Sequence, residues 1–188
     1  MDSKYNYKFC FTGSQGTGKS TILRIFKDKG FNVITEVVRN LHKTKGINVN
    51  EMGDREGQEL IFGTYKELLS QDTNFISDRG LTDVCSYTYF HGETNDDMSK
   101  LAAEELAEIK EFVKNHPDVK FFYFPIEFPV VDDKFRSTDE HFRSCIDQLI
   151  LSVLKECGID YITVCGPVEE RVKIVEEYLD KCCVVDNV

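Results

Sequence analysis

Gly13-Ser14-Gln15-Gly16-Thr17-Gly18-Lys19-Ser20-Thr21 is the stretch of the sequence that decides the fold. It matches the phosphate-binding pattern G-x-x-x-x-G-K-[ST] without a gap. Residues 7–12, just before it, are rich in aromatic side chains and predict a buried strand. Residues 20–27 place apolar side chains at helical spacing and predict a helix. A strand, a glycine-rich turn and a helix are the surroundings in which this pattern binds phosphate.

The chemistry of phosphate binding explains each part of this loop. Its glycines allow backbone angles that other residues avoid, so that the N–H groups can point inward. These N–H groups and the N-terminus of the next helix attract anions. We expect Lys19 to be exposed in the loop and to meet the β- and γ-phosphates, and Ser20 to offer its hydroxyl to Mg²⁺. The nine residues therefore predict a binding site for ATP with Mg²⁺.

The composition is that of an ordinary globular chain, with 41% hydrophobic and 30% charged residues among 188. This length predicts a single domain, residues 1–188. The net charge of −10 makes a nucleic-acid partner less expected without excluding it. Seven cysteines without a C-x-x-C pattern fit a reducing compartment. With no signal-like start and no run of transmembrane length, we expect a cytoplasmic protein that does not bind membranes, and leave homodimerisation open.

Strands and helices are predicted to alternate along the rest of the chain. A short helix is expected from Val37, a loop over 42–53, and a helix that begins at a capping box over 137–140 and ends at Gly158. Further strands are expected at 31–36, 75–78, 119–124 and 161–164, and further helices at 56–69, 81–90, about 95–115 and 168–179. This α/β alternation predicts a parallel sheet of about five strands with helices on both faces.

Charged residues follow three of the predicted strands, at the edge where such sheets bind ligands. We expect Lys19 after the first strand, Glu36 at the end of the second, and Asp78-Arg79 at the end of the third. Phosphoryl transfer needs a base, a bound metal ion and positive charge near the transferred group. We therefore predict that Glu36 is the base and that Asp78 holds Mg²⁺ or its water. We predict that Arg79 contacts the acceptor or the γ-phosphate. More ordinary roles are a solvated charge for Glu36, a helix cap for Asp78, and pairing with an acidic neighbour for Arg39.

The irregular segment at about 126–138 is predicted to form a lid. It contains Arg136, and Arg143 follows in the next helix. Closure of this lid would bring one or both arginines onto the phosphates, Arg136 as a catalytic group and Arg143 as a nucleotide contact. Both could instead be surface charges on an acidic protein.

These motifs resemble those of the small-molecule P-loop kinases. That group includes deoxynucleoside, thymidylate and bacterial nicotinamide riboside kinases, and viral hydroxymethylpyrimidine kinases look similar. The resemblance rests on the loop, on Thr35-Glu36-x-x-Arg39 and on Ile76-Ser77-Asp78-Arg79. It implies a P-loop NTPase fold with strand order 2-3-1-4-5, and adenine near the turn Gly166, Pro167 and Val168. Val37 after the glutamate and Gly80 after the Asp-Arg pair depart from the nucleoside kinases, which leaves the acceptor open.

The sequence thus predicts a kinase that transfers the γ-phosphate of ATP to a hydroxyl of a nucleoside, a nucleotide or a related small molecule. One alternative is a kinase acting on hydroxymethylated pyrimidines in DNA. Another is a P-loop NTPase with a regulatory or mechanical role. Because Asp78 is followed by an arginine and not by a second acid, the kinase is favoured over the mechanical NTPase.

Overall fold

The computed structural model describes residues 5–129 and 138–182 and contains one parallel sheet. Its strands are β1 (Lys8–Thr12), β2 (Val33–Ile34), β3 (Phe75–Asp78), β4 (Val119–Tyr123) and β5 (Tyr161–Thr163). They pair in parallel in the order β2-β3-β1-β4-β5. This confirms the predicted fold class and the strand order implied by the resemblance to P-loop kinases.

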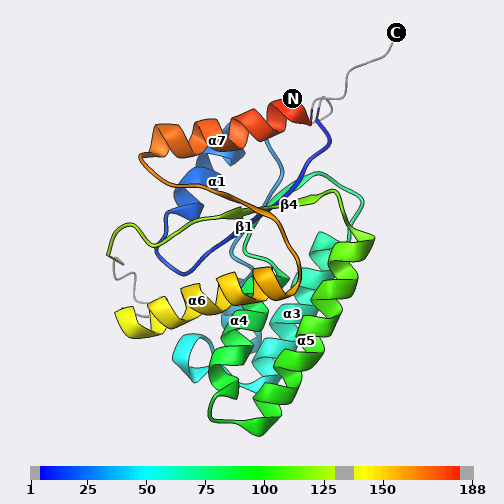
Figure 1. Cartoon of the computed structure of the whole chain (residues 1–188), viewed down its shortest axis with the longest axis vertical. Helices are drawn as coiled ribbons and strands as arrows, with labels where there is room; N and C mark the ends of the chain where they lie inside the picture. Colours follow the sequence, from blue (N-terminus) through cyan, green and yellow to red (C-terminus); the bar gives the residue numbers. More distant parts are fainter. Residues whose placement is uncertain (1–4, 130–137, 183–188) are drawn as a thin grey trace.

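Helices cover both faces of the sheet. They are α1 (Lys19–Asp28), α2 (Val37–Lys45), the short 3₁₀ helix η2 (Asn50–Met52), α3 (Arg55–Leu69), α4 (Leu81–Gly92), α5 (Asp96–Asn115), α6 (Glu140–Glu156) and α7 (Val168–Lys181). Figure 1 shows α1 and α7 together on one face, and α3, α4, α5 and α6 on the other. Among the described residues, none of the helices combines the length and the apolar character needed to cross a membrane.

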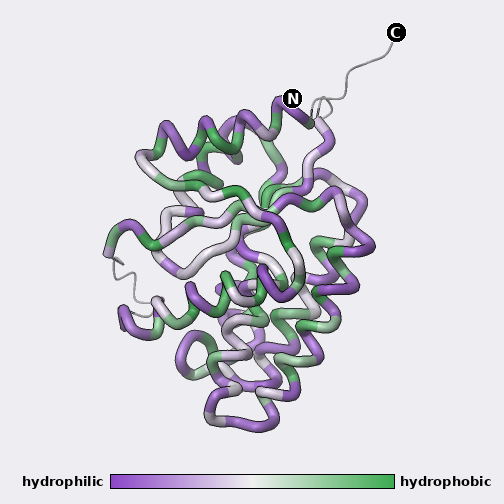
Figure 2. The backbone as a smooth tube through the Cα atoms, in the orientation of Figure 1, coloured by the Kyte–Doolittle hydropathy of each residue, from purple (hydrophilic) through white to green (hydrophobic). Residues whose placement is uncertain are grey.

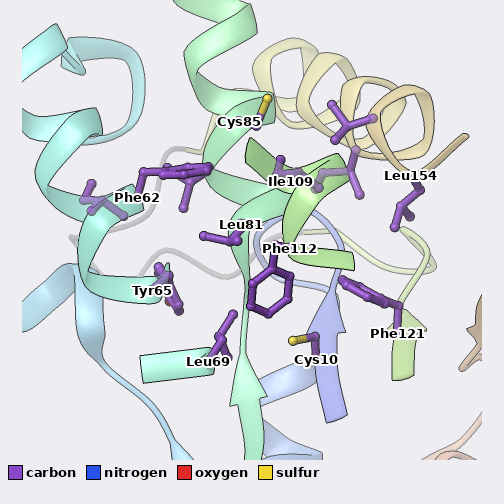
Figure 3. Close-up of a cluster of buried hydrophobic side chains, with 14 of the residues drawn as sticks. Cys10, Phe62, Tyr65, Leu69, Leu81, Cys85, Ile109, Phe112, Phe121 and Leu154 are labelled. Atoms are coloured by element: carbon purple, nitrogen blue, oxygen red, sulfur yellow. The ribbon is translucent and has the colours of Figure 1, made fainter. Parts of the chain in front are cut away.

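The two faces of the sheet carry two separate hydrophobic clusters. Along β1, Phe9 and Phe11 pack with the side chains of α1 and α7, whereas Cys10 packs with those of α3, α4 and α5. Figure 3 shows Cys10 in the second cluster with Tyr65, Leu81 and Phe112. Hydrophobic and hydrophilic residues alternate along the covering helices (Figure 2), as expected for helices with one buried face. This packing fixes the carboxyl ends of β1 and β3 side by side.

The structure differs from the predicted elements mainly around α2. The second strand ends at Ile34, so Glu36 lies beyond it as the N-cap residue of α2. The loop predicted over 42–53 is wrong in part, because α2 continues to Lys45 and η2 forms within it. Before α6, residue 137 of the predicted capping box lies outside the described residues. Asp139 is the N-cap there, and its carboxylate accepts hydrogen bonds from the N–H groups of the next turn.

Candidate active site

The loop between β1 and α1 has the backbone that its glycines permit. Gly13, Gly16 and Gly18 have φ angles of 135°, 70° and 90°, in the region that side chains rarely adopt. A Cβ atom on Gly13 would lie 2.4 Å from the carbonyl oxygen of Phe124, the residue that follows β4. The first glycine is therefore required by close backbone packing as well as by its φ angle.

Lys19 is buried, which corrects the expectation that it is exposed. Only 5% of the residue is accessible, and its ammonium group donates to the carbonyl oxygens of Gly13 (2.6 Å) and Ser14 (2.7 Å) and to Thr17 Oγ1 (3.0 Å). The reason is that the curled loop gathers several oxygen atoms around the start of α1, and a buried ammonium group needs such partners. The charge of Lys19 is thus held inside the loop.

Ser20 and Asp78 meet at the ends of β1 and β3. The Ser20 hydroxyl donates to a carboxylate oxygen of Asp78 at 3.2 Å, and Asp78 pairs with Phe11 in the register of the sheet. The N-cap residue of α4 is Gly80, which excludes the helix-cap role for Asp78. A hydroxyl beside a carboxylate suits Mg²⁺, which takes few protein ligands and keeps water and phosphate oxygens as the others. Among the described residues, no group of three or more His, Cys, Asp or Glu is arranged to hold a metal ion.

Arg79 is held by a buried acid that sequence reasoning missed. Its backbone has a φ of 76°, its guanidinium lies 3.4 Å from Asp83 Oδ1, and the same group lies 5.4 Å above the ring of Tyr87. The Asp83 carboxylate is fully buried and also accepts from the N–H groups of Gly13 (3.3 Å) and Gly80 (3.2 Å). Asp83 therefore connects Arg79 to the first residue of the phosphate-binding loop.

The protonation of Asp83 reflects this environment. Burial raises the pKa of its carboxyl group above the ordinary value, and the positive charges of Arg79 and Lys19 act against that rise. A signal for this residue was present in the sequence, because Asp83 interrupts the otherwise apolar start of the predicted helix 81–90.

Glu36 adopts a left-handed conformation, with a φ of 61°, at the start of α2. About half of its side chain is exposed, and its carboxylate lies 3.5 Å from Arg39 Nε. The acidic neighbour that was expected for Arg39 is therefore Glu36 itself. The catalytic role of Glu36 stays a prediction.

A single cavity of about 490 Å³ brings most of the predicted residues together. The predicted residues that line it are Gln15, Gly16, Thr17, Gly18, Lys19, Ser20, Thr21, Glu36, Asp78 and Arg79, and Arg39 lines it as well. Among the described residues, three that are not glycine have a positive φ, namely Glu36, Asn50 and Arg79, and all three line this cavity. Because strained backbone concentrates at functional sites, this coincidence marks the cavity as the candidate active site.

The rest of the cavity wall is partly apolar. It is formed by the side chains of α2, α3 and α4 and the residues before η2, including Val37, Val38, Val49, Ile61, Val84, Tyr65 and Tyr87. Gln58 on α3 is 2% exposed and lines the same wall, and its Oε1 has no hydrogen-bond partner among the described residues. An unsatisfied buried amide oxygen is suited to accept a hydrogen bond from a bound molecule. Gln58 was also missed, because glutamine in a helix gives no sequence signal.

Other predicted residues lie outside the cavity wall. Arg143 is 1% exposed and donates to loop carbonyl groups, so it is not a surface charge. Gly166 donates its N–H to the Glu127 carboxylate at 3.1 Å, Pro167 is the N-cap of α7, and Val168 begins that helix. Their proximity to adenine stays a prediction. Arg136 and most of the predicted lid lie outside the described residues.

Comparison with known proteins shows the family to which the chain belongs. Residues 8–171 match the family described as AAA domain (AAA_28), and the chain belongs to that family. No curated protein matches the chain.

Solved structures share the fold at low sequence identity. A deoxyadenosine kinase from M. mycoides, with dCMP and dCDP bound, superposes with a TM-score of 0.63 at 16% identity, covering 93% of this chain and 98% of the kinase. The NadR protein in complex with NR gives a TM-score of 0.72 at 14% identity, over 98% of this chain and 54% of NadR. The chain thus spans about half the length of NadR. These likenesses confirm the fold of small-molecule P-loop kinases.

Proposed function

We propose that this protein is an ATP-dependent kinase that phosphorylates a hydroxyl group of a nucleoside or a nucleoside-like small molecule. The observation that carries the proposal is the shared cavity, which is lined both by the phosphate-binding loop and by a partly apolar wall with the Gln58 amide. Its volume, about 490 Å³, is in the usual range for small-molecule sites. The fold shared with a deoxyadenosine kinase supports the same reaction class.

On the donor side, the loop N–H groups and Lys19 would bind the phosphates of ATP. Ser20 and Asp78, already in contact at 3.2 Å, would hold Mg²⁺ together with phosphate oxygens and water. The metal ion would supply positive charge for the transferring phosphoryl group.

On the acceptor side, Glu36 would take the proton from the attacking hydroxyl, and Arg79 would orient the acceptor. The valine and isoleucine side chains of the wall fit a flat ring, and Gln58 Oε1 would accept a hydrogen bond from an N–H group on it. A nucleoside base and a pyridine carboxamide both combine a flat ring with such N–H groups. This chemistry favours a nucleoside-like acceptor over a simple sugar.

A screen of acceptors tests the proposal. Purified protein is incubated with Mg-ATP and, separately, with nucleosides, deoxynucleoside monophosphates, nicotinamide riboside and hydroxymethyl-modified DNA, and both ADP and phosphorylated product are quantified. We expect ADP formation to rise with one class of small molecule and to equal the phosphorylated product. Lys19→Met is the control and should lose at least about 100-fold in rate.

Two other outcomes would overturn the proposal. Phosphorylation of the modified DNA alone would assign the acceptor to nucleic acid. ADP formation that no acceptor stimulates would support an NTPase with a regulatory or mechanical role.

A further inference from the structure

Two buried arginines contact the outer side of the phosphate-binding loop. The first is Arg143 on α6, whose Nε donates to the carbonyl oxygen of Gln15 at 2.9 Å and whose Nη2 donates to that of Gly16 at 3.3 Å. Its Nη1 pairs with the Glu140 carboxylate at 3.1 Å. The Ser14 hydroxyl also donates to the backbone carbonyl of Arg143 at 2.9 Å, so loop and helix are joined in both directions.

The second is Arg171 on α7, which is 2% exposed. Its Nη1 donates to the carbonyl oxygen of Thr17 at 2.6 Å, and its Nε donates to that of Gly166 at 2.7 Å. Its Nη2 pairs with the Glu127 carboxylate. Arg171 therefore joins the loop to the turn after β5 and to the segment after β4.

Together the two guanidinium groups bind three consecutive loop carbonyls, those of residues 15, 16 and 17. A trans peptide group is planar, and its C=O and N–H bonds point in opposite directions. Fixing these three carbonyls on the outer side therefore fixes the N–H groups of Gly16, Thr17 and Gly18 on the inner side. These are the N–H groups that a phosphate-binding loop presents to its anion.

We propose that Arg143 and Arg171 are positioning residues that hold the N–H groups of residues 16–18 ready for a bound triphosphate. Neither arginine is among the residues that line the cavity, so both act through the loop. Each charge is paired with a glutamate, Glu140 or Glu127, which leaves the guanidinium groups to work mainly as fixed hydrogen-bond donors. The proposal rests on the proposed function only in that the loop binds a nucleotide.

Conservative variants test the proposal. Arg143→Lys and Arg171→Lys keep a positive charge and a long apolar stem, but an ammonium group lacks the planar fork that reaches several acceptors at once. We expect each variant to bind inorganic triphosphate, followed by calorimetry, at least about 10-fold more weakly than the wild type. We also expect faster hydrogen exchange at the amides of residues 16–18 in the absence of any ligand.

Matched controls separate positioning from general stability. Ile150→Ala on α6 and Val175→Ala on α7 remove fully buried side chains of the same two helices. These variants should lower the melting temperature, yet they should leave the triphosphate affinity within about 2-fold of the wild type. The proposal is overturned if the lysine variants bind triphosphate like the wild type, or if the controls lose as much affinity.

The wild-type protein provides a test that needs no variant. Backbone NMR relaxation of the unliganded protein should give order parameters near 0.85 for the amides of residues 16–18, and values below about 0.6 would contradict a pre-formed loop. Weak triphosphate binding by the lysine variants, combined with no acceptor phosphorylation by the wild type, would keep this inference while removing the proposed kinase function.

Discussion

At the scale of single residues, three non-glycine residues with positive φ angles mark the candidate active site. Glu36 and Arg79 each hold a conformation that costs about 1–3 kcal/mol and persists only where neighbours impose it, and Asn50 holds one that asparagine adopts more readily. For Arg79 the neighbours are visible, because its N–H donates to the carbonyl oxygen of Phe11 and its own carbonyl accepts from the Ser77 hydroxyl at 2.7 Å. The sequence predicted Glu36 and Arg79 from their places after strands, but their backbone strain depends on contacts that no local pattern encodes.

Asp83→Asn tests the link between the phosphate-binding loop and Arg79, for which we propose a role in binding the acceptor. The amide keeps the shape of the carboxylate, but it loses the charge that faces Arg79 and presents a donor where Asp83 now accepts. We expect the KM for the acceptor to rise about 10-fold, with a much smaller change in ATP affinity. Steady-state kinetics with each substrate varied in turn measures the difference, and an unchanged acceptor KM would leave Asp83 with a purely structural role.

Glu105 on α5 gives a pH-dependent stability that is independent of the site. Only 2% of it is exposed. Burial raises the pKa of Glu105 to about 8, the nearby hydroxyl of Thr88 and the charge of Arg55 lower it, and the charges of Glu108 and Glu59 raise it. An acid whose pKa is raised in the folded state favours folding while it is protonated. Stability should therefore fall as the pH rises from about 4.5 towards 8.

Glu105→Gln should remove this dependence, because the amide does not ionise. Relative to the wild type, we expect the free energy of unfolding of the variant to gain about 3–4 kcal/mol between pH 5 and pH 8. Urea denaturation at the two pH values measures the gain. Parallel losses of stability in both proteins would show that another group is responsible.

At the scale of helices and strands, local sequence patterns predicted those elements whose formation depends on local interactions. The β1–loop–α1 unit and the boundaries of β3 were predictable because glycine spacing and apolar periodicity specify them. The segment between α2 and α3 was not, because its order comes from distant contacts. One of these is His91 Nε2 on α4, which lies 2.9 Å from the carbonyl oxygen of Asn50. Arg171 was missed, and the burial of Arg143 was not predicted, for the same reason: each arginine meets its partners only when helix and loop pack together.

Gly13→Ala tests the packing of the loop against β4. Its Cβ would lie 2.4 Å from the carbonyl oxygen of Phe124, at a φ of 135°. We expect a loss of at least about 2 kcal/mol in the free energy of unfolding, because backbone must move. Gly30→Ala is the matched control, with a φ of 88° and nothing within 4 Å of the new Cβ, and it should cost about 1 kcal/mol. Equal losses in the two variants would contradict the packing argument.

At the scale of the whole molecule, the strand order creates the site. The order β2-β3-β1 places the ends of β3 and β1 next to each other and brings the start of α2 to the same edge. Residues 19, 36 and 78–79, far apart in the sequence, therefore line one cavity. The alternation of strands and helices predicted a parallel sheet, whereas the strand order came from the resemblance to P-loop kinases. The partly apolar wall of the cavity could not be predicted, because it is assembled from three helices whose packing no local sequence pattern reveals.

Glu36→Gln tests most directly the central claim that one cavity joins an ATP site to an acceptor site. ADP and phosphorylated acceptor are measured together for the wild type and the variant, with ATP affinity determined separately. If Glu36 takes the proton of the acceptor hydroxyl, acceptor phosphorylation should fall by about 100-fold or more. ATP affinity and the slow hydrolysis that needs no acceptor should change much less. A parallel loss of acceptor phosphorylation and background hydrolysis, or no loss of either, would contradict the account.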